Sequence, residues 1–559
     1  MPPLMDASEV RHTIQQRAAE RVWAMRQRPL VRIWDKDWGD GTTPGKPKAI
    51  IFGETDCDHE EILNETGEAN LGLFGNHRLR DWLIDEIAEE EDVHLTIDYP
   101  ATGYRWHGKA HTITEKGVAS GVEYVRLNFL HGIQHAKKIT CFSNPVLPPQ
   151  FQWPKQYLWA GPSAYGIRSV LFLNLLRRFG PLWALPDNIF DGDSWLLNLD
   201  PSNWGQVVMP GAGGLLGDTS MWTTFTTRWG NFFDVVTPIL RDSGLQLIAT
   251  RWLPGDPQPA PSHFFLTKPT LVWDIRDVSG VRGPSGTILD GLLKLGSAIL
   301  EDGISEVHSI LDLPNADEYS TPGFFGVVQT HPWIVWRRGM RAGINPSITR
   351  SGVSGISEWE MTIHKALAGA ITTGGKSPSY INAAVKLLLN GVLGYIGMLF
   401  GNPGLALGIF DKQVEDVILA FIRVPHPLRQ AAMGSDSYGE HWENGGVNGF
   451  SLSTLQAVRI GLWNTRAYTS FKIGGIVNAA PYAVGRHFTV GDRAGAEIGR
   501  SGRVYVDQIH AIRGSWSRSK NVTWEISLGT DAEEQPPGAM LGRQVEQIRS
   551  LIQANVVES

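Results

Sequence analysis

The stretch VYVDQIHAIRGSWSRSKNVTWEISLG, residues 504–529, decides the fold class of this chain. In its second half, apolar Val522, Trp524, Ile526 and Leu528 alternate with Thr523, Glu525 and Ser527. A period of two places successive side chains on opposite faces of a strand, so it predicts half-buried β-strands. The same period occurs far upstream, at Val93, Leu95 and Ile97 and again at Val125, Leu127 and Phe129. We therefore expect antiparallel β-structure near both ends of the chain.

Helical patterns lie outside and between these strands. Asp6 and Glu9 have the spacing of a capping box before apolar residues that recur every four positions, which predicts an amphipathic helix within residues 1–26. Residues 169–180, SVLFLNLLRRFG, also have a helical pattern. A second terminal pattern, spaced by four, three and four, predicts a C-terminal helix or short coiled coil within 533–559. Its apolar positions are Leu541, Val545, Ile548 and Ile552.

Composition excludes several classes of protein. A formal charge of −7 and a pI near 6.2 argue against a surface that binds nucleic acid, since such surfaces are dominated by positive charge. Cys57 and Cys141 are far apart and lack CxxC spacing, so neither a disulfide framework nor a zinc site is predicted. The first residues lack the apolar core of a secretion signal, so we expect synthesis in the cytoplasm of the cell that makes the chain.

Several long segments resemble one family, the tail-hub (baseplate-hub) minor tail proteins of siphophages that infect actinobacteria. The segments are MRQRPLVRIWDKDW (25–38), LVWDIRDVSGVRGPSGTILDGL (271–292), GGKSPSYINAAVKLLLN (374–390), LGYIGMLFGNPGLALGIFD (393–411), TRAYTSFKI (465–473) and residues 504–529. The resemblance extends over nearly the whole chain. It implies a homotrimer in which each subunit contributes two β-barrel domains that imitate part of a six-fold tail-tube ring.

The resemblance also implies a structural role without catalytic residues, metal or cofactor. The trimer is expected at the virion tail tip, between the distal tail protein and other minor tail or fibre proteins. It is expected to plug the channel and to open for the tape-measure protein and DNA at infection, with no sequence-specific contact to nucleic acid. A tail-associated hydrolase acting on the cell envelope is the alternative.

The patterns and the resemblance together predict an α+β multidomain fold, with tube-like antiparallel β-barrel domains near both ends, a mixed α/β insertion and a central apolar helical segment. The expected order is an N-terminal amphipathic helix (1–26), a first tube-like β-domain (27–145, with 262–284 as a candidate completing segment), an inserted mixed α/β domain (146–261), a central region (285–430), a second tube-like β-domain (431–532) and a C-terminal helix (533–559).

The central apolar segment, residues 387–410, is long enough to cross a hydrocarbon layer and contains no charge. Its glycines recur every three to four residues, a spacing that allows close packing of helices, whereas Pro403 would kink a single helix. We expect a buried or trimer-axis plug, with insertion into the host membrane as the alternative. The candidate plug or membrane residues are Leu387, Gly391, Gly394, Gly397, Gly401, Pro403, Gly404, Gly408 and Phe410.

Candidate subunit contacts come from aromatic residues and from the C-terminal helix. Large amphipathic rings favour interfaces, and the chain has 21 tryptophans. The candidates are Trp34, Trp38, Trp516, Trp524, Leu541, Val545, Ile548 and Ile552.

Catalytic patterns are weak. His131 and His135 have i,i+4 spacing, but their surroundings alternate like a strand and lack the HExxH pattern of a zinc site. The acidic residues 56–61 contain carboxylates that could serve a glycosidase, although we expect a solvated loop there. Nothing beside either cysteine predicts an activated thiol.

Overall fold

The computed structural model describes residues 27–39, 45–180, 199–300, 310–311, 326–336, 356–374, 421–443, 461–476, 482–497 and 504–529, with a few positions inside these ranges left out, and Gln16, Trp23 and Val458 singly. Nearly all of the predicted N-terminal helix 1–26 lies outside the described residues. The apolar segment 387–410, with all its candidate residues, and the C-terminal helix with Leu541, Val545, Ile548 and Ile552 also lie outside them.

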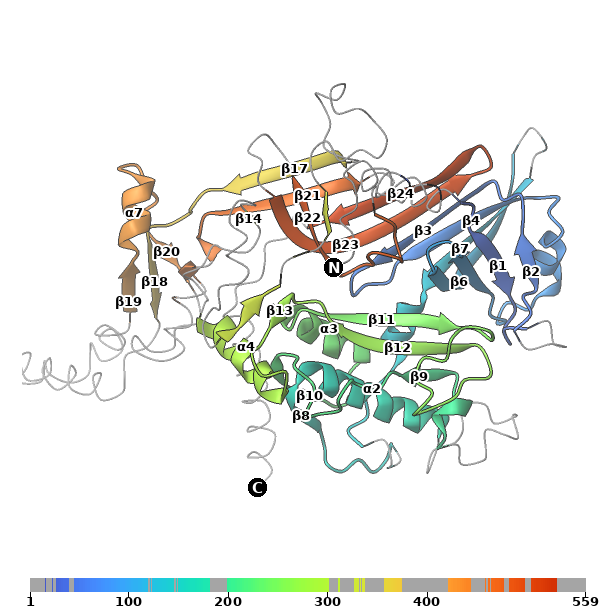
Figure 1. The fold of residues 1–559 in the computed structure, drawn as a ribbon, viewed down its shortest axis with the longest axis horizontal. Helices are drawn as coiled ribbons and strands as arrows, with labels where there is room; N and C mark the ends of the chain where they lie inside the picture. The colour runs from blue at the N-terminus through green and yellow to red at the C-terminus, as the bar shows by residue number, and fades with distance from the viewer. Residues whose placement is uncertain are drawn as a thin grey trace, which may run out of the picture.

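One 14-stranded sheet, the main sheet, combines strands from both ends of the chain (Figure 1). Its strands follow the order β17 (Ile356–His364), β21 (Tyr468–Ile476), β24 (Lys520–Leu528), β23 (Val504–Ser517), β3 (Asp56–Ile62), β4 (Glu68–Phe74), β7 (Glu123–His131), β6 (Tyr104–Gly117), β5 (His94–Tyr99), β1 (Leu30–Trp34) and β2 (Ala49–Ile51). Off this path, β14 (Ile310–Leu311) and β22 (Arg493–Glu497) pair with β23, and β16 (Ile334–Trp336) pairs with β22.

The two ends of the chain meet where β3 pairs with β23. These strands are antiparallel, with Cα partners running from Ala511 opposite Ile62 to Ser517 opposite Asp56. The strands predicted near both ends are therefore confirmed, but they pair with each other in one continuous sheet. Within the described residues, the outermost strands β17 and β2 do not pair with each other, so the sheet is open and the predicted closed barrels are not seen. The division into domains stays a prediction.

Alternation along the strands builds a core on one face of this sheet. Ile97, Leu127 and Trp524 are fully buried in a single apolar cluster that includes residues from β1 to β7 and from β22 to β24. The π-helical turn η1 (Trp82–Glu86) adds Leu83 to the cluster. Because β-strands present every second side chain to the same side, the sequence period of two produces this one-sided core.

A second unit, here called the α/β unit, comprises residues 132–277 and lies beside the main sheet in Figure 1. It contains the 3₁₀ helix η2 (Gly132–Lys138), β8 (Tyr157–Pro162), α2 (Ser163–Phe179), η4 (Pro201–Asn203), β9 (Gln206–Val208), β10 (Trp222–Thr227), α3 (Phe232–Asp242), β11 (Leu245–Trp252) and β12 (Thr270–Asp277). The helix predicted from residues 169–180 is confirmed in α2. Helices α2 and α3 pack with both small sheets, β10-β8 and β11-β12-β9, around a separate apolar core.

Smaller elements follow the α/β unit. They are β13 (Val281–Arg282), α4 (Ile288–Leu300), β15 (Val328–Gln329), β18 (Ala370–Gly374), β19 (Phe421–Pro425), α7 (Pro427–Met433) and β20 (His441–Trp442). β18, β19 and β20 form a small sheet at one end of the view, close to α7 (Figure 1). The fold is thus α+β and mostly sheet. In the part of the chain that the structure describes, no helix combines the length and the apolar character needed to cross a membrane.

Candidate functional site

The face of the main sheet opposite its apolar core carries a row of polar and charged side chains. We call it the polar face, and define it by Asp56, Asp58, Glu60, Glu68, Asn70, Arg126, Asn128, Arg513 and Glu525. All of them are partly or fully exposed. Their strands β24, β23, β3, β4 and β7 are consecutive in the sheet, so the polar face crosses the seam between the two ends of the chain.

Hydrogen bonds connect the polar face from strand to strand. Arg513 donates to Asp58 at 3.2 Å, and the Asn128 amide donates to Asn70 and to Glu68, each at 3.2 Å. Arg126 pairs with Asp56 at 3.0 Å. Carboxylates outnumber the guanidinium groups. Partial burial raises the pKa of Glu60, Arg513 opposes this, and the carboxylates Asp58, Glu68 and Glu525 raise it further.

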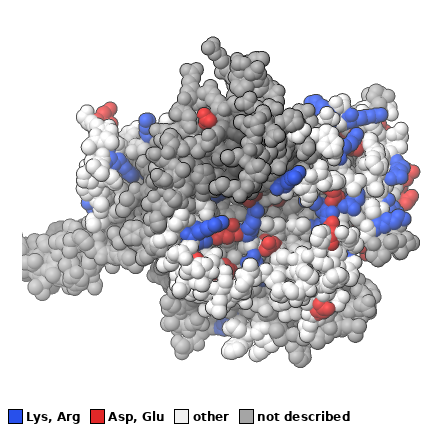
Figure 2. All heavy atoms as spheres, in the orientation of Figure 1, with Lys and Arg blue, Asp and Glu red and all other residues white. Residues whose placement is uncertain are grey.

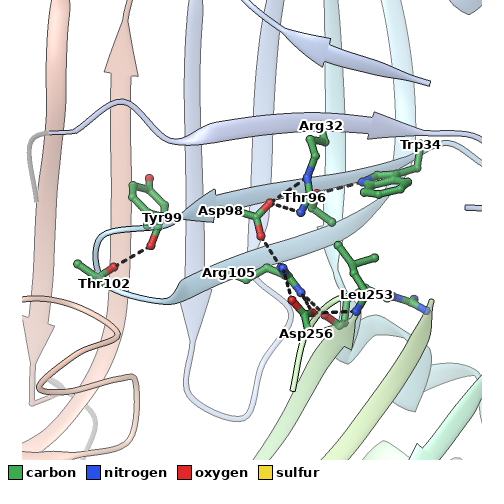
Figure 3. Close-up of polar contacts among 10 residues, drawn as sticks. Arg32, Trp34, Thr96, Asp98, Tyr99, Thr102, Arg105, Leu253 and Asp256 are labelled. Atoms are coloured by element: carbon green, nitrogen blue, oxygen red, sulfur yellow. Dashed lines mark hydrogen bonds and ion pairs between the residues drawn. The ribbon is translucent and has the colours of Figure 1, made fainter. Parts of the chain in front are cut away.

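Among the described residues, polar contacts join the main sheet to the α/β unit at each end of β11, and we call these the first and the second junction. At the first, Arg105 of β6 donates to Asp98 of β5 and to Asp256, which follows β11 (Figure 3). Arg105 also donates to the carbonyl of Arg251 at 2.9 Å, and Arg32 of β1 pairs with Asp98 at 2.7 Å. Two arginines and two aspartates thus form a chain of partly buried ion pairs between the two units.

Aromatic side chains cover this first junction. Trp34, Trp38 and Leu253 form a small buried cluster, and the Trp34 indole donates to Thr96 at 2.9 Å. The ring of His94 stacks on Trp38 with centroids 4.3 Å apart. The guanidinium of Arg251 lies 4.2 Å from the centroid of Trp38. The junction therefore combines apolar burial with cation–π contact.

At the second junction, the opposite end of the β11–β12 hairpin is held by hydrogen bonds. The side chain of Asn64 donates to the carbonyl of Leu245 and accepts from the amide of Leu247, both at 2.8 Å. Arg276 pairs with Asp492 at 3.1 Å, and the Gln508 amide donates to the carbonyl of Val278 at 2.9 Å. In Figure 2, acidic and basic side chains lie next to each other in the middle of the view, between the upper and lower parts of the molecule.

The structure packs all four candidate contact tryptophans inside the chain. Trp34 and Trp38 lie in the first junction, and Trp516 and Trp524 lie in the core of the main sheet. Trp516 donates to buried Glu54 at 2.7 Å, and Trp524 lies 4.8 Å from the ring of Tyr99. These rings find their packing and hydrogen-bond partners within their own chain. The period of two explains the burial of Trp516 and Trp524, which stand at core-facing positions of β23 and β24.

The catalytic alternatives have little support in this geometry. The acidic residues 56–61, expected as a loop, form β3 in the middle of the main sheet. Burial raises the pKa of Cys57 well above its usual value and that of Cys141 to about 12, so both thiols stay protonated and are weak nucleophiles. Among the described residues, no group of three or more His, Cys, Asp or Glu side chains is placed to hold a metal ion.

Sequence reasoning missed the charged residues of the two junctions. Arg105, Asp256 and Arg276 stand in ordinary strand or turn patterns, and their partners are more than 140 residues away or on another strand. The one sequence signal for such a contact is a charged residue at a strand position that is expected to be partly buried. Arg105, which follows Tyr104 and precedes Trp106 between two buried neighbours, had that signal.

Comparison with known proteins places the chain in a family. The model of the siphovirus ReqiPepy6 Gp37-like proteins matches residues 30–530. Minor tail protein Gp28 of Mycobacterium phage L5 is 27% identical over 591 residues, with 95% of both chains covered. The protein of the same name from Mycobacterium phage D29 is 26% identical over 590 residues, again with 95% of both covered.

Among solved structures, the 43 kDa tail protein of prophage MuSo2 from Shewanella oneidensis aligns with a TM-score of 0.37 and 9% identity, over 91% of this chain and 99% of that one. The family match confirms the resemblance found in the sequence. The chain therefore belongs to the family of siphovirus ReqiPepy6 Gp37-like proteins.

Proposed function

We propose that the chain is the hub of a siphophage tail tip and works as a homotrimer. In this proposal the trimer adapts the six-fold tube, through the distal tail protein, to a three-fold tip that carries other minor tail or fibre proteins. It closes the channel at rest and opens for the tape-measure protein and DNA at infection. Its place is the virion tail tip, and its role is structural, without catalysis.

The polar face of the main sheet is the observation that carries the proposal. An antiparallel sheet with a core on one face and polar side chains on the other suits a wall between protein and water. The polar face crosses five consecutive strands, so one subunit offers a broad wall rather than a single strand edge. Its excess of carboxylates repels phosphate groups, which lets a polyanion pass without being held.

The apolar segment 387–410 supplies the closing element within this proposal. An uncharged stretch of this length must be hidden from water before infection. Residues Leu387, Gly391 and Phe410 would then leave the trimer axis when the hub opens, with entry into the host membrane as the second possible destination. The C-terminal residues Leu541, Val545, Ile548 and Ile552 remain proposed contacts between subunits.

Charge reversal on the polar face tests the proposal in assembled virions. Glu68→Lys with Glu525→Lys changes two exposed carboxylates on β4 and β24, and Glu89→Lys with Glu90→Lys makes the same charge change on exposed residues outside the sheet. Light scattering should give three times the 61.7 kDa chain mass for the wild type and both variants. DNA release from virions triggered in vitro should slow several-fold only in the Glu68/Glu525 variant.

Two outcomes would contradict the proposal. A monodisperse monomer for the wild-type chain would remove the trimeric hub. A trimer whose two variants release DNA at the wild-type rate would remove the polar face from the channel wall.

A further inference from the structure

Arg251 of β11 is a buried cation between the α/β unit and the main sheet. Only 6% of the residue is exposed, and its Nε atom has no hydrogen-bond partner. Among the described residues no carboxylate pairs with it, and its guanidinium contacts the Trp38 ring instead. Burial lowers the pKa of Arg251 to about 9, so the group is still charged at neutral pH. Such a cation tolerates neutral neighbours much better than positively charged ones.

Histidines from several elements surround this cation. His94 of β5, His107 of β6 and His135 of η2 each interact electrostatically with Arg251. The ring of His131, at the end of β7, lies 4.9 Å from that of His107. His107 is almost fully buried, and its Nε2 atom has no hydrogen-bond partner. Burial lowers the pKa of all four imidazoles, so they are neutral at neutral pH.

The other charged groups at this junction are already paired or positive. Arg105 and Lys109 of β6 and Arg178 of α2 add positive charge near the histidines. Asp98 and Asp256 both bind Arg105, and Asp92 pairs with Lys109 at 2.7 Å. The carboxylates of the junction are therefore occupied by other cations, and protonated imidazoles would meet mainly positive charge.

We infer that this junction is a proton-sensitive clasp, in which protonation of His94, His107, His131 and His135 separates the Arg251 end of β11 from the main sheet. The second junction, at Asn64 and Gln508, stays closed and acts as the pivot. The inference goes beyond the proposed function, because no part of it depends on the trimer or on the channel.

The direction of the pH effect follows from burial. Burial lowers the pKa of His131 to about 4 and that of His135 to about 3, and it lowers the pKa of His94 and His107 well below the usual value. Once the clasp opens, the rings regain a pKa near 6.5. The closed state thus keeps its full stability above about pH 6.5 and loses it as the pH falls toward the closed-state values. At pH 5 His131 and His135 each favour the open state by roughly 30-fold.

Hydroxyl-radical footprinting of the unsubstituted full chain at pH 7.5 and pH 5 tests the clasp. Oxidation of Trp38 and Leu253, which are buried in the first junction, should rise several-fold at pH 5. Val278 at the second junction and Trp524 in the core of the main sheet should stay protected. No change at Trp38, or an equal rise at Trp38 and Trp524, would overturn the inference, the second because it indicates global unfolding.

Substituted chains identify the titrating groups. His94→Phe with His135→Gln keeps an aromatic ring on Trp38 and removes two of the four proton acceptors, so oxidation of Trp38 at pH 5 should fall several-fold below that of the wild type. His111→Gln changes an exposed histidine of β6 and should leave the response unchanged. Thermal melts at pH 7.5 establish that both chains are folded. If Trp38 in the His94/His135 chain is oxidised at pH 5 as it is in the wild type, these histidines do not control the junction and the inference fails.

Discussion

Arg105 connects the main sheet to the α/β unit through ion pairs and a hydrogen bond. It donates to Asp98 and Asp256 and to the backbone of Arg251, and only 19% of its side chain is exposed. Arg105→Ala leaves Asp256 without its cation in a partly buried site, so the free energy of unfolding should fall by about 2 to 3 kcal/mol. Urea unfolding measures this loss.

Lys36→Ala is the matched control for Arg105→Ala. Lys36 pairs with Glu91 at 3.1 Å in solvent, and 52% of its side chain is exposed. Exposed ion pairs contribute little, so this substitution should leave the free energy of unfolding nearly unchanged. Equal losses in the two variants would show that the Arg105 contacts add nothing beyond a surface pair.

The seam between β3 and β23 is the element on which the main sheet depends. Gly514 of β23 stands opposite His59, and a Cβ atom there would lie 2.5 Å from the Nε2 atom of His59. Gly514→Ala must therefore displace the buried His59 ring, and overpacking of this kind costs about 1 to 3 kcal/mol. The melting temperature should drop by several degrees.

Gly117→Ala controls for the general effect of replacing a strand glycine. Its added Cβ would meet only the Cγ atom of Glu123, at 3.9 Å. Removing a glycine from a strand without a clash reduces the flexibility of the unfolded chain and stabilises slightly. The two variants should thus shift the melting temperature in opposite directions, and a common shift would contradict the close packing of the seam.

The strand pattern could be predicted from sequence because alternation is local. Residues 522–528 show it without interruption, and they form β24. The acidic strand β3 was misjudged as a loop because its charges hid the same alternation, in which Cys57 and His59 face the core while Asp56 and Asp58 face away. Its pairing with β23 depends on residues some 450 positions apart, and no periodicity encodes such a partner.

The functional surfaces were harder to predict than the strands. Tryptophan frequency suggested subunit contacts, yet Trp34 and Trp524 are fully buried. A single sequence does not distinguish a ring that packs inside its own subunit from one that packs against another. The clasp was missed for a related reason, since His94, His107 and His135 come together only when β5, β6 and η2 fold around β11.

At the scale of the whole molecule, the pairing of β3 with β23 ties the two ends of the chain into one sheet. The residues between β3 and β23 in the sequence, including the α/β unit, form one long connection between these two paired strands. Such an arrangement can form within one subunit or, by exchange of strands, between subunits of an oligomer. In the first case each subunit completes its own main sheet, and in the second case β3 of one subunit pairs with β23 of another.

Engineered cysteines distinguish these two cases. Glu60 and Arg513 are Cα partners across the seam, and antiparallel partners lie at a Cα separation that a disulfide accepts. In a chain carrying Glu60→Cys and Arg513→Cys, oxidation should give a faster-migrating monomer on a non-reducing gel, because the link closes a loop of most of the chain. Glu60→Cys with Thr523→Cys is the control, since Thr523 lies on β24 beyond β23 and should not link. Covalent dimers or trimers from the first pair would mean that the sheet is completed by strands from neighbouring subunits, whereas the fast monomer assigns the whole polar face to a single chain.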